Sequence, residues 1–205
     1  LMDLCQKLSF LRKKSAKNLE SDITKALLDL NFSQVKFEIR FTQTEHPSDN
    51  GFDEAEYLIS LNPGEDLKPL SKIASGGELS RIMLGLKSVL AGKDDIDTLI
   101  FDEIDTGISG RTAQKVSEKM ALIAKKHQVI CITHLPQIAS MADTHFLIEK
   151  NVTDNTTRTT IHKLNAEVII TELSRMLGGT EINGIVYDNA KEMKRQADEL
   201  KKMSV

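Results

Sequence analysis

The sequence predicts an α/β domain built around a mainly parallel sheet. Two short apolar runs, 98–101 and 129–133, have the length and composition of strands that are buried on both faces. A segment with helical apolar spacing, 110–126, separates them, and this strand–helix–strand order is typical of parallel sheets. The chain has 205 residues, which is enough for one such domain and a small appendage.

The composition indicates a folded protein: 40% of the residues are hydrophobic and 28% are charged. No run approaches the roughly 20 apolar residues of a membrane-spanning helix, so we expect a soluble chain without a membrane partner. The formal net charge of −3 gives no overall cationic surface for DNA. Cys5 and Cys131 are the only cysteines, and their wide separation favours reduced cytoplasmic thiols over a disulfide.

The first 30 residues have helical spacing with partial heptad character. Leu1, Leu4, Leu8 and Leu11 follow the 3-4-3 spacing of coiled-coil positions a and d. The apolar spacing then resumes one residue out of phase over 19–30. Two interpretations fit this pattern, the end of a coiled coil that leads into a globular helix and a plain amphipathic surface helix.

After residue 31 the apolar period changes. Alternation predicts strands at 35–41 and 57–61, with the polar stretch 44–51 as a loop between them. Further along, the same criteria predict a helix over 77–91 that Gly92 closes, a hairpin of strands 146–149 and 158–162, and helices over 166–177 and 184–203.

The run Ser75-Gly76-Gly77-Glu78 opens the helix predicted near residue 77. Free N–H groups and the positive end of the helix dipole favour an anion there, and glycine lets a phosphate approach the main chain. The same residues suit a plain helix cap, in which Ser75 or Ser80 accepts hydrogen bonds from the first N–H groups. Taken alone, this turn does not distinguish the two roles.

Asp102 and Glu103 directly follow the strand 98–101. Carboxylates at the C-terminal end of a parallel strand lie at the sheet edge where α/β folds bind ligands. Asp102 is suited to hold Mg²⁺, and Glu103 is suited to orient or deprotonate an attacking water. The simpler alternative is a pair of solvated acids at a strand end.

Asp105 and His134 complete the series. Asp105 lies in a turn that contains glycine, where it could simply cap the next helix. His134 follows the strand 129–133, where its ring could donate to a phosphate oxygen or to water, although a lone strand-end histidine is more often structural. Because all four motifs occur in order, each on the element that its role requires, we favour a nucleotide site.

In this order the four motifs resemble the signature, Walker B, D-loop and switch-histidine elements of ABC-type ATPases. Segments 70–84, 101–110 and 133–139 closely resemble the RecN family of bacterial DNA-repair proteins, and the resemblance spans roughly 70–179. Glu78 stands where transporter ATPases usually carry Gln, which resembles the SMC-like branch. The fold that this resemblance implies is the C-terminal lobe of an ABC-type ATPase head, similar to P-loop NTPases.

The resemblance also implies a division of the chain and a role for each motif. Residues 1–30 are expected to be the returning arm of the family's coiled coil, and 31–205 to be the C-terminal lobe. The implied ligands are ATP and Mg²⁺. The implied roles are Asp102 as the metal ligand, Glu103 and His134 as catalytic residues at the water and the γ-phosphate, Ser75, Gly76, Gly77 and Glu78 as the signature that meets the nucleotide of a second head, and Asp105 as the link between the two sites.

The sequence contains no G-x-x-x-x-G-K-[ST] phosphate loop. The family carries that loop before its coiled coil, and this chain begins with Leu1 rather than Met. We therefore expect a C-terminal half that hydrolyses ATP only together with its own N-terminal half and is inactive alone.

The implied function is ATP-dependent head dimerisation and hydrolysis in recombinational repair of DNA double-strand breaks. The expected partners are the N-terminal half, a second identical head, and DNA contacted through the full-length protein in the cytoplasm, at the nucleoid. The rival interpretations are an SMC-type chromosome-structuring head, an ABC transporter nucleotide-binding domain, and a non-enzymatic scaffold that dimerises without turnover. The leucine-spaced helix and β-like segments before the signature argue against the transporter, and paired Asp102 and Glu103 argue against the scaffold.

Overall fold

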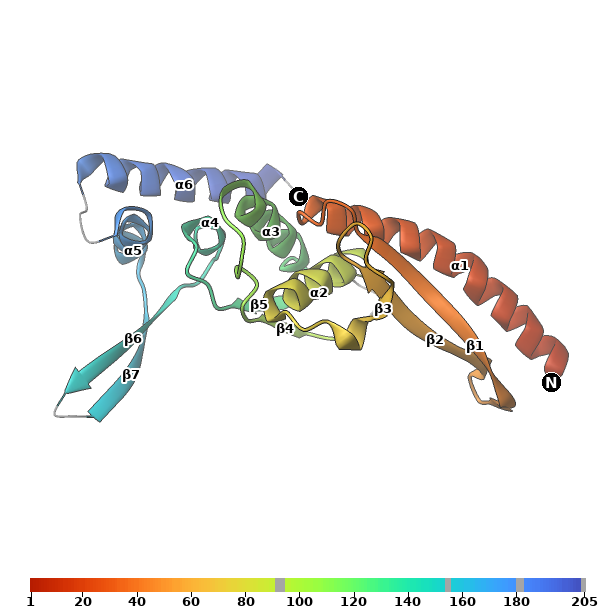
Figure 1. Cartoon of the computed structure of the whole chain (residues 1–205). Helices are drawn as coiled ribbons and strands as arrows, with labels where there is room; N and C mark the ends of the chain where they lie inside the picture. The colour runs from red at the N-terminus through yellow and green to blue at the C-terminus, as the bar shows by residue number, and fades with distance from the viewer. Residues whose placement is uncertain (91–94, 154–155, 180–182, 204–205) are drawn as a thin grey trace.

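The structure, a computed structural model, describes residues 1–90, 95–153, 156–179 and 183–203. In chain order the first elements are α1 (Met2–Asp29), β1 (Lys36–Ser48), β2 (Gly51–Ser60), β3 (Lys68–Pro69), the short 3-10 helix η1 (Leu70–Lys72) and α2 (Gly76–Leu90). They are followed by β4 (Thr98–Phe101), α3 (Gly110–Ile123), β5 (Gln128–Cys131), α4 (Pro136–Ala139), β6 (Phe146–Thr153), β7 (Thr156–Lys163), α5 (Ala166–Gly178) and α6 (Gly184–Met203). Figure 1 shows this arrangement.

Helix α1 lies along the β1–β2 hairpin, as Figure 1 shows. The buried stripe of α1 includes Cys5, Ser9, Ala16 and Ile23, whose spacings of four and seven residues keep them on one face. This stripe continues without a break through the position where the leucine pattern changes phase. The change therefore reflects two different faces of one straight-running helix.

The leucines at the start of α1 lie outside that stripe. Leu1 is 83% exposed, Leu4 66% and Leu11 58%, while Leu8 is 37% exposed and touches the hairpin near Gly51. The 3-4-3 pattern thus marks an apolar seam on the side of α1 that this chain leaves largely uncovered.

The loop predicted over 44–51 is wrong. Strand β1 continues to Ser48 and β2 begins at Gly51, with the register broken between Gln43 and Ser48. The side chains of this stretch are polar, which is why the sequence suggested a loop, yet it forms the end of a two-stranded ribbon, with Ser48 opposite Gly51 and a turn at 49–50. A ribbon whose side chains are exposed on both faces needs no alternating apolar pattern, and no residue at this end of β1 is buried.

The main hydrophobic core of the described residues is formed by the C-terminal half of α1, strands β1 and β2, helices α2 and α3, and strand β4. Gly85 allows α1 and α2 to approach closely, because a Cβ built there would lie 2.7 Å from Leu27 Cδ2. Leu27, Ile82 and Leu84 are completely buried at this contact. These residues fix α2, whose first turn belongs to the candidate site.

Strands β4 and β5 form the predicted parallel pair, with Leu99 opposite Val129 and Ile100 opposite Ile130. The α/β class is thereby confirmed, and the β1–β2–β3 and β6–β7 sheets are antiparallel. Leu99 and Phe101 point into the core, whereas Ile100 is 68% and Ile130 45% exposed. Only one face of this sheet is covered within the described chain.

Several predicted boundaries differ slightly from the structure. The helix predicted over 110–126 ends at Ile123, and the strand predicted over 129–133 is Gln128–Cys131. The two final helices and the preceding hairpin are confirmed. Gly92, expected to close α2, lies outside the described residues. No helix in the described ranges is both long and apolar enough to cross a membrane.

The β6–β7 hairpin extends away from the body, and α5 and α6 pack on each other, as Figure 1 shows. Lys194 of α6 donates hydrogen bonds at 3.0 Å to the backbone oxygens of Ser140 and Ala142. These two carbonyls directly follow α4. The last helix is therefore fastened to the segment that comes after the β5 strand end.

Candidate functional site

The acidic pair lies in a sharp turn at the C-terminal end of β4. Asp102 and Glu103 are both exposed, and Glu103 adopts a φ of 56°, which is uncommon for a residue with a side chain. The Asp102 carboxylate accepts a hydrogen bond of 2.9 Å from the Glu103 backbone N–H, and the Thr106 N–H donates to the Glu103 carbonyl at 3.0 Å. The turn presents both carboxylates at the sheet edge where the sequence predicts a site.

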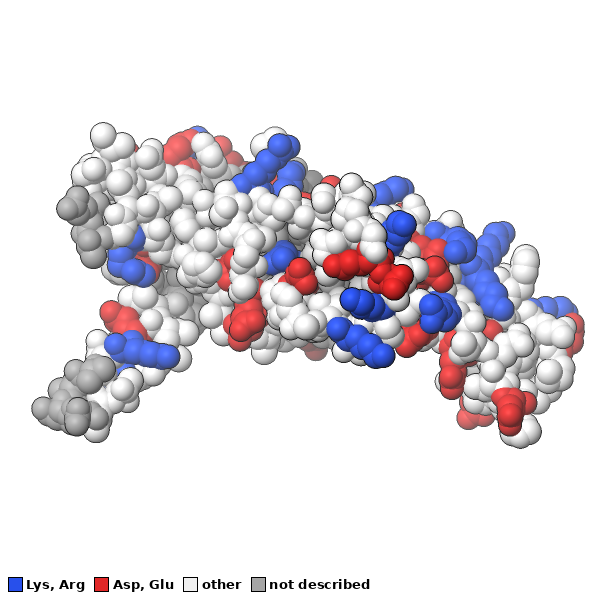
Figure 2. All heavy atoms as spheres, in the orientation of Figure 1, with Lys and Arg blue, Asp and Glu red and all other residues white. Residues whose placement is uncertain are grey.

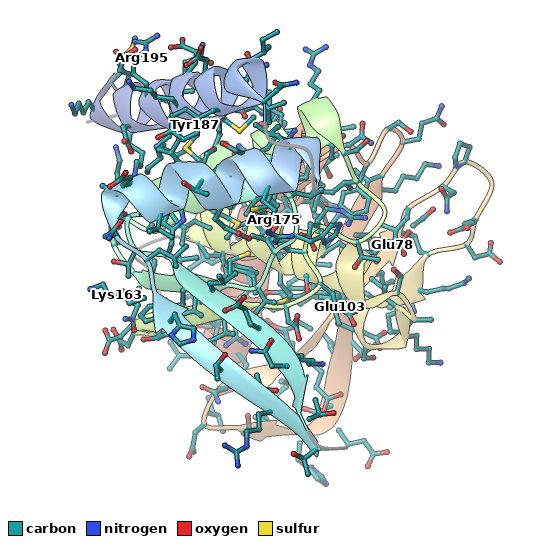
Figure 3. The ribbon with its side chains drawn as sticks, turned by 90° about the vertical axis from the view of Figure 1, so that its left-hand side faces the viewer. Glu78, Glu103, Lys163, Arg175, Tyr187 and Arg195 are labelled. Carbon is teal, nitrogen blue, oxygen red and sulfur yellow. The ribbon has the colours of Figure 1, made fainter. Side chains whose placement is uncertain are left out.

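The first turn of α2 packs directly against this acidic turn. The Glu103 carboxylate occupies the space that a Cβ on Gly76 would need. A Cβ on Gly77 would lie 3.0 Å from the Glu103 carbonyl oxygen. The Ser80 hydroxyl donates to the Asp102 carbonyl at 2.7 Å. Figure 3 shows Glu103 and Glu78 on the same side of the chain, in the region where α2 begins. Gly77 is thus required for close approach to the backbone of the acidic turn, whereas Gly76 faces only the movable end of the Glu103 side chain.

The helix start also has the cap that the simpler interpretation predicts. The Ser75 hydroxyl accepts from the Glu78 N–H at 3.4 Å, a long hydrogen bond. Ser80, the other cap candidate, bonds to the Asp102 carbonyl instead. Ser75 and Gly76 are exposed and Gly77 is buried. Ser75 and Gly76 are therefore accessible to a ligand from outside the chain.

Arg81 is a site residue whose role was not predicted from the sequence. Arg81 is buried, and its guanidinium donates to the Thr106 carbonyl at 2.8 Å and lies 5.5 Å from the ring centre of Phe32, which follows α1. Burial lowers the pKa of Arg81, and the nearby Glu78 carboxylate opposes that shift. One cation therefore joins the acidic turn to α1 and α2. The available signal was an arginine within an otherwise apolar helical stripe.

Asp105 and His134 are brought together by the parallel pairing of β4 and β5. Asp105 is only 4% exposed, and its Oδ2 accepts hydrogen bonds from the Thr133 hydroxyl at 2.6 Å and the His134 N–H at 2.8 Å. The same oxygen lies 3.0 Å from His134 Nδ1, while 73% of the His134 side chain is exposed. The Thr133 hydroxyl also accepts from the Leu135 N–H at 3.0 Å.

The structure brings the selected residues into two contacting groups, one around the acidic pair and one around Asp105. Glu103 touches Gly76, Ser80 bonds the Asp102 carbonyl, and Asp105 bonds His134. The expected contact of Asp105 across a head dimer remains a prediction, as do the roles of the other residues in catalysis and binding.

The site is acidic around the end of β5. Burial raises the pKa of the Cys131 thiol to about 12, with further contributions from the charges of Asp105 and Asp102. A locally negative potential of this kind favours cations. Asp102 fits a magnesium ion, which proteins commonly hold through one or two carboxylates together with substrate phosphates. Within the described ranges no group of three or more His, Cys, Asp or Glu side chains could hold a metal by itself.

Comparison with known proteins finds similar bacterial proteins that are named as DNA repair proteins. It is 41% identical over 208 residues to DNA repair protein RecN of Bacillus subtilis, an alignment that covers 94% of this chain and 36% of that protein. It is 40% identical over 183 residues to DNA repair protein RecN of Vibrio cholerae, covering 89% of this chain and 33% of the relative. The chain therefore spans about a third of the length of these curated relatives. No family model matches the chain.

Solved structures agree on the fold. The Smc head domain with a coiled coil and joint from Pyrococcus yayanosii superposes with a TM-score of 0.54 at 20% identity, over 81% of this chain and 30% of that one. This likeness identifies the lobe of an SMC-type head as the fold. With the extensive sequence identity to several relatives that share one name, it follows that the chain belongs to the RecN family.

Proposed function

We propose that this chain is the C-terminal lobe of an ATP-hydrolysing head in a DNA double-strand-break repair protein. The observation that carries the proposal is the packing of the signature turn, the acidic turn and the His134 segment around one end of the parallel pair β4–β5. Relatives that match nearly the whole chain are DNA repair proteins. Recombinational repair in the cytoplasm, at the nucleoid, is the corresponding biological role.

In this proposal the exposed carboxylates divide the chemistry. When bound, MgATP supplies the electrophilic γ-phosphate, and Asp102 helps to hold the metal. Glu103 orients the attacking water and accepts its proton, and His134 contacts the γ-phosphate with its exposed ring. The positive φ of Glu103 supports this assignment, because strained backbone recurs at functional turns.

A second head completes the reaction in this proposal. Ser75, Gly76, Gly77 and Glu78 meet the nucleotide of the second head, so one ligand contacts both partners only when they are closed. Asp105 couples the two sites. Because the Glu103 carboxylate lies against Gly76 in the same chain, binding of the signature to the second head's nucleotide would affect the position of that carboxylate.

The remainder of the protein is proposed to cover the open face of the β4–β5 sheet and to supply the phosphate loop. Ile100, Ile130 and Ile132 are 68%, 45% and 51% exposed on or beside this pair. Two opposed isoleucines of the projecting hairpin, Ile148 and Ile161, are also exposed. Apolar surface of this extent on a sheet calls for another layer.

The coiled-coil arm is proposed from the uncovered leucine seam of α1. The buried stripe of the same helix is already occupied by the β1–β2 hairpin, so a second helix is needed to cover Leu1, Leu4 and Leu11. DNA is proposed as a partner of the full-length protein. On the face drawn in Figure 2, basic side chains gather into a local group over the middle of α1, with acidic side chains beside it and over the rest of the lobe, so no continuous cationic surface extends across that view.

The experiment joins this chain to its N-terminal half and measures ATP hydrolysis with and without DNA. Glu103→Gln is expected to lower the rate of ATP hydrolysis about 10²-fold or more, because the amide cannot accept the proton. ATP-driven dimerisation is expected to remain. Glu54→Gln on β2 is the matched control, an identical change at an exposed position away from the site. Unchanged hydrolysis by Glu103→Gln removes Glu103 from the proposed role.

The chain alone is proposed to be inactive, because its sequence lacks the phosphate loop. Isothermal titration should detect at most weak ATP binding, and a phosphate-release assay should give no turnover. Robust hydrolysis by the isolated 205 residues would instead reveal a phosphate-binding element elsewhere in the chain. A pure dimerising scaffold predicts that the joined halves also lack turnover.

A further inference from the structure

Asp105 differs from the other two acids of the site in its surroundings. Asp102 and Glu103 are exposed, whereas Asp105 is 4% exposed and faces inward. Its Oδ2 atom receives three contacts from the end of β5: the Thr133 hydroxyl, the His134 N–H and the His134 ring. This buried carboxylate therefore interacts with groups of its own chain.

The contact with the His134 ring constrains the proton on that ring. The carboxylate oxygen Oδ2 of Asp105 lies 3.0 Å from Nδ1 of His134, where it would repel a lone pair, so this approach favours a proton on Nδ1. In the neutral ring this leaves the lone pair on Nε2. Since 73% of the side chain is exposed, the Nε2 edge is the part of the ring that remains free to meet a ligand.

We propose that Asp105 is the positioning residue of His134, fixing both the orientation of its ring and its Nδ1–H tautomer. This gives Asp105 a role inside its own subunit, in addition to any contact between heads. The importance of the ring for hydrolysis rests on the proposed function above. The tautomer itself is a property of this chain and needs no nucleotide.

A purely structural role for Asp105 makes a different prediction. The backbone contact to the His134 N–H, with the Thr133 hydroxyl bridging to the Leu135 N–H at 3.0 Å, would be enough to shape the start of α4. In that case the orientation of the ring would not depend on Asp105. The protonation site on the imidazole separates the two roles.

The experiment labels the histidines of the 205-residue chain with ¹⁵N and records long-range ¹H–¹⁵N correlations at about pH 9, where ordinary histidines are neutral. The chain has five histidines, and His134→Gln identifies the signal of interest. We expect the Nδ1–H tautomer in the wild type, the opposite of the Nε2–H form that free imidazoles favour in water. A wild-type ring in the Nε2–H form overturns the proposal without the need for any variant.

Two variants separate the ring contact from the backbone contact. Asp105→Ala is expected to shift His134 to mainly Nε2–H, whereas Thr133→Val should retain Nδ1–H because it leaves the carboxylate in place. Asp102→Asn is the matched control for loss of a nearby charge and should not change the tautomer. A shift in Asp102→Asn equal to that in Asp105→Ala would refute the specific pairing.

Kinetics in the joined protein give the functional arm. Asp105→Asn is expected to lower kcat by about 10- to 100-fold, the loss typical of outer partners that orient a histidine, with KM changed much less. An equal rise in KM with unchanged kcat would refute positioning of the ring. If the wild-type assembly hydrolyses no ATP, the proposed function fails while the tautomer measurement still decides the role of Asp105.

Discussion

Replacing Gly77 by Ala tests the packing of the signature turn on the acidic turn. The added methyl would lie 2.9 Å from Thr106 Cβ, 3.0 Å from the Glu103 carbonyl oxygen and 3.1 Å from the Thr106 carbonyl oxygen. Favourable contact needs about 3.5–4.0 Å, so the turn must move by roughly half an ångström. Two of the three atoms are backbone and belong to a turn that is closed by its own hydrogen bond.

The size of the effect follows from two opposing terms. Overpacking of this kind costs about 1–3 kcal/mol, and the better helix propensity of alanine returns at most about 1 kcal/mol. The free energy of unfolding should therefore fall by about 1–2 kcal/mol. For a chain of this size that corresponds to a Tm lower by about 2–8 °C.

Gly76→Ala is the matched comparison, measured by thermal unfolding followed by circular dichroism. The methyl at Gly76 meets only the end of the Glu103 side chain, which can swing away. The Tm of Gly76→Ala should therefore stay within about 2 °C of the wild type, while the displaced carboxylate lowers ATP turnover in the joined protein. Equal destabilisation by the two variants would show that backbone crowding is not what makes Gly77 necessary.

Three further predictions concern the core, the C-terminal region and a thiol. Leu27→Ala, at a completely buried position, should cost about 2.7–5 kcal/mol in chemical unfolding, and adding Gly85→Ala should cost less than the sum of the single changes because its methyl fills the space that Leu27 leaves. Burial, with help from Lys194 and Lys201, lowers the pKa of His145 against an opposing hydrogen bond to Ala142 and the charge of Asp198. The stability that neutral His145 provides is therefore complete above the usual histidine pKa of about 6.5 and is lost as the pH falls through the lowered pKa. Between about pH 7 and 5, calorimetry should show a smaller decrease of Tm in His145→Gln than in the wild type. With its pKa raised to about 12, Cys131 should react with iodoacetamide at pH 8 roughly 10³-fold more slowly than an ordinary thiol, as followed by mass spectrometry in Cys5→Ser, and rapid labelling would contradict this.

The sequence predicted the elements whose composition follows from burial. Strands β4 and β5 carry apolar side chains on both faces, although only one face is covered here. These short apolar runs were enough to identify both strands. The acidic pair could be placed because its position relative to β4 is fixed by the chain itself. Motif order then indicated that these residues belong to one site.

Features that depend on distant partners could not be predicted in this way. The interior position of Arg81 depends on Phe32 and on the Thr106 carbonyl, 25 residues away. The partners of Asp105 lie 28 and 29 residues further along the chain, so its local turn suggested only a helix cap. The 44–51 ribbon was missed because its pairing depends on strand register and not on apolar side chains.

The bonds from Lys194 to the carbonyls of Ser140 and Ala142 mean that helix α6 helps to hold the segment that follows His134. Cutting α6 away would leave those two carbonyls without their cation and loosen a region well over forty residues upstream. A purification tag appended beyond Met203, whose side chain is 85% exposed, leaves this anchorage intact. Removing α6 to obtain a smaller domain would therefore disturb the segment beside His134, which belongs to the candidate site.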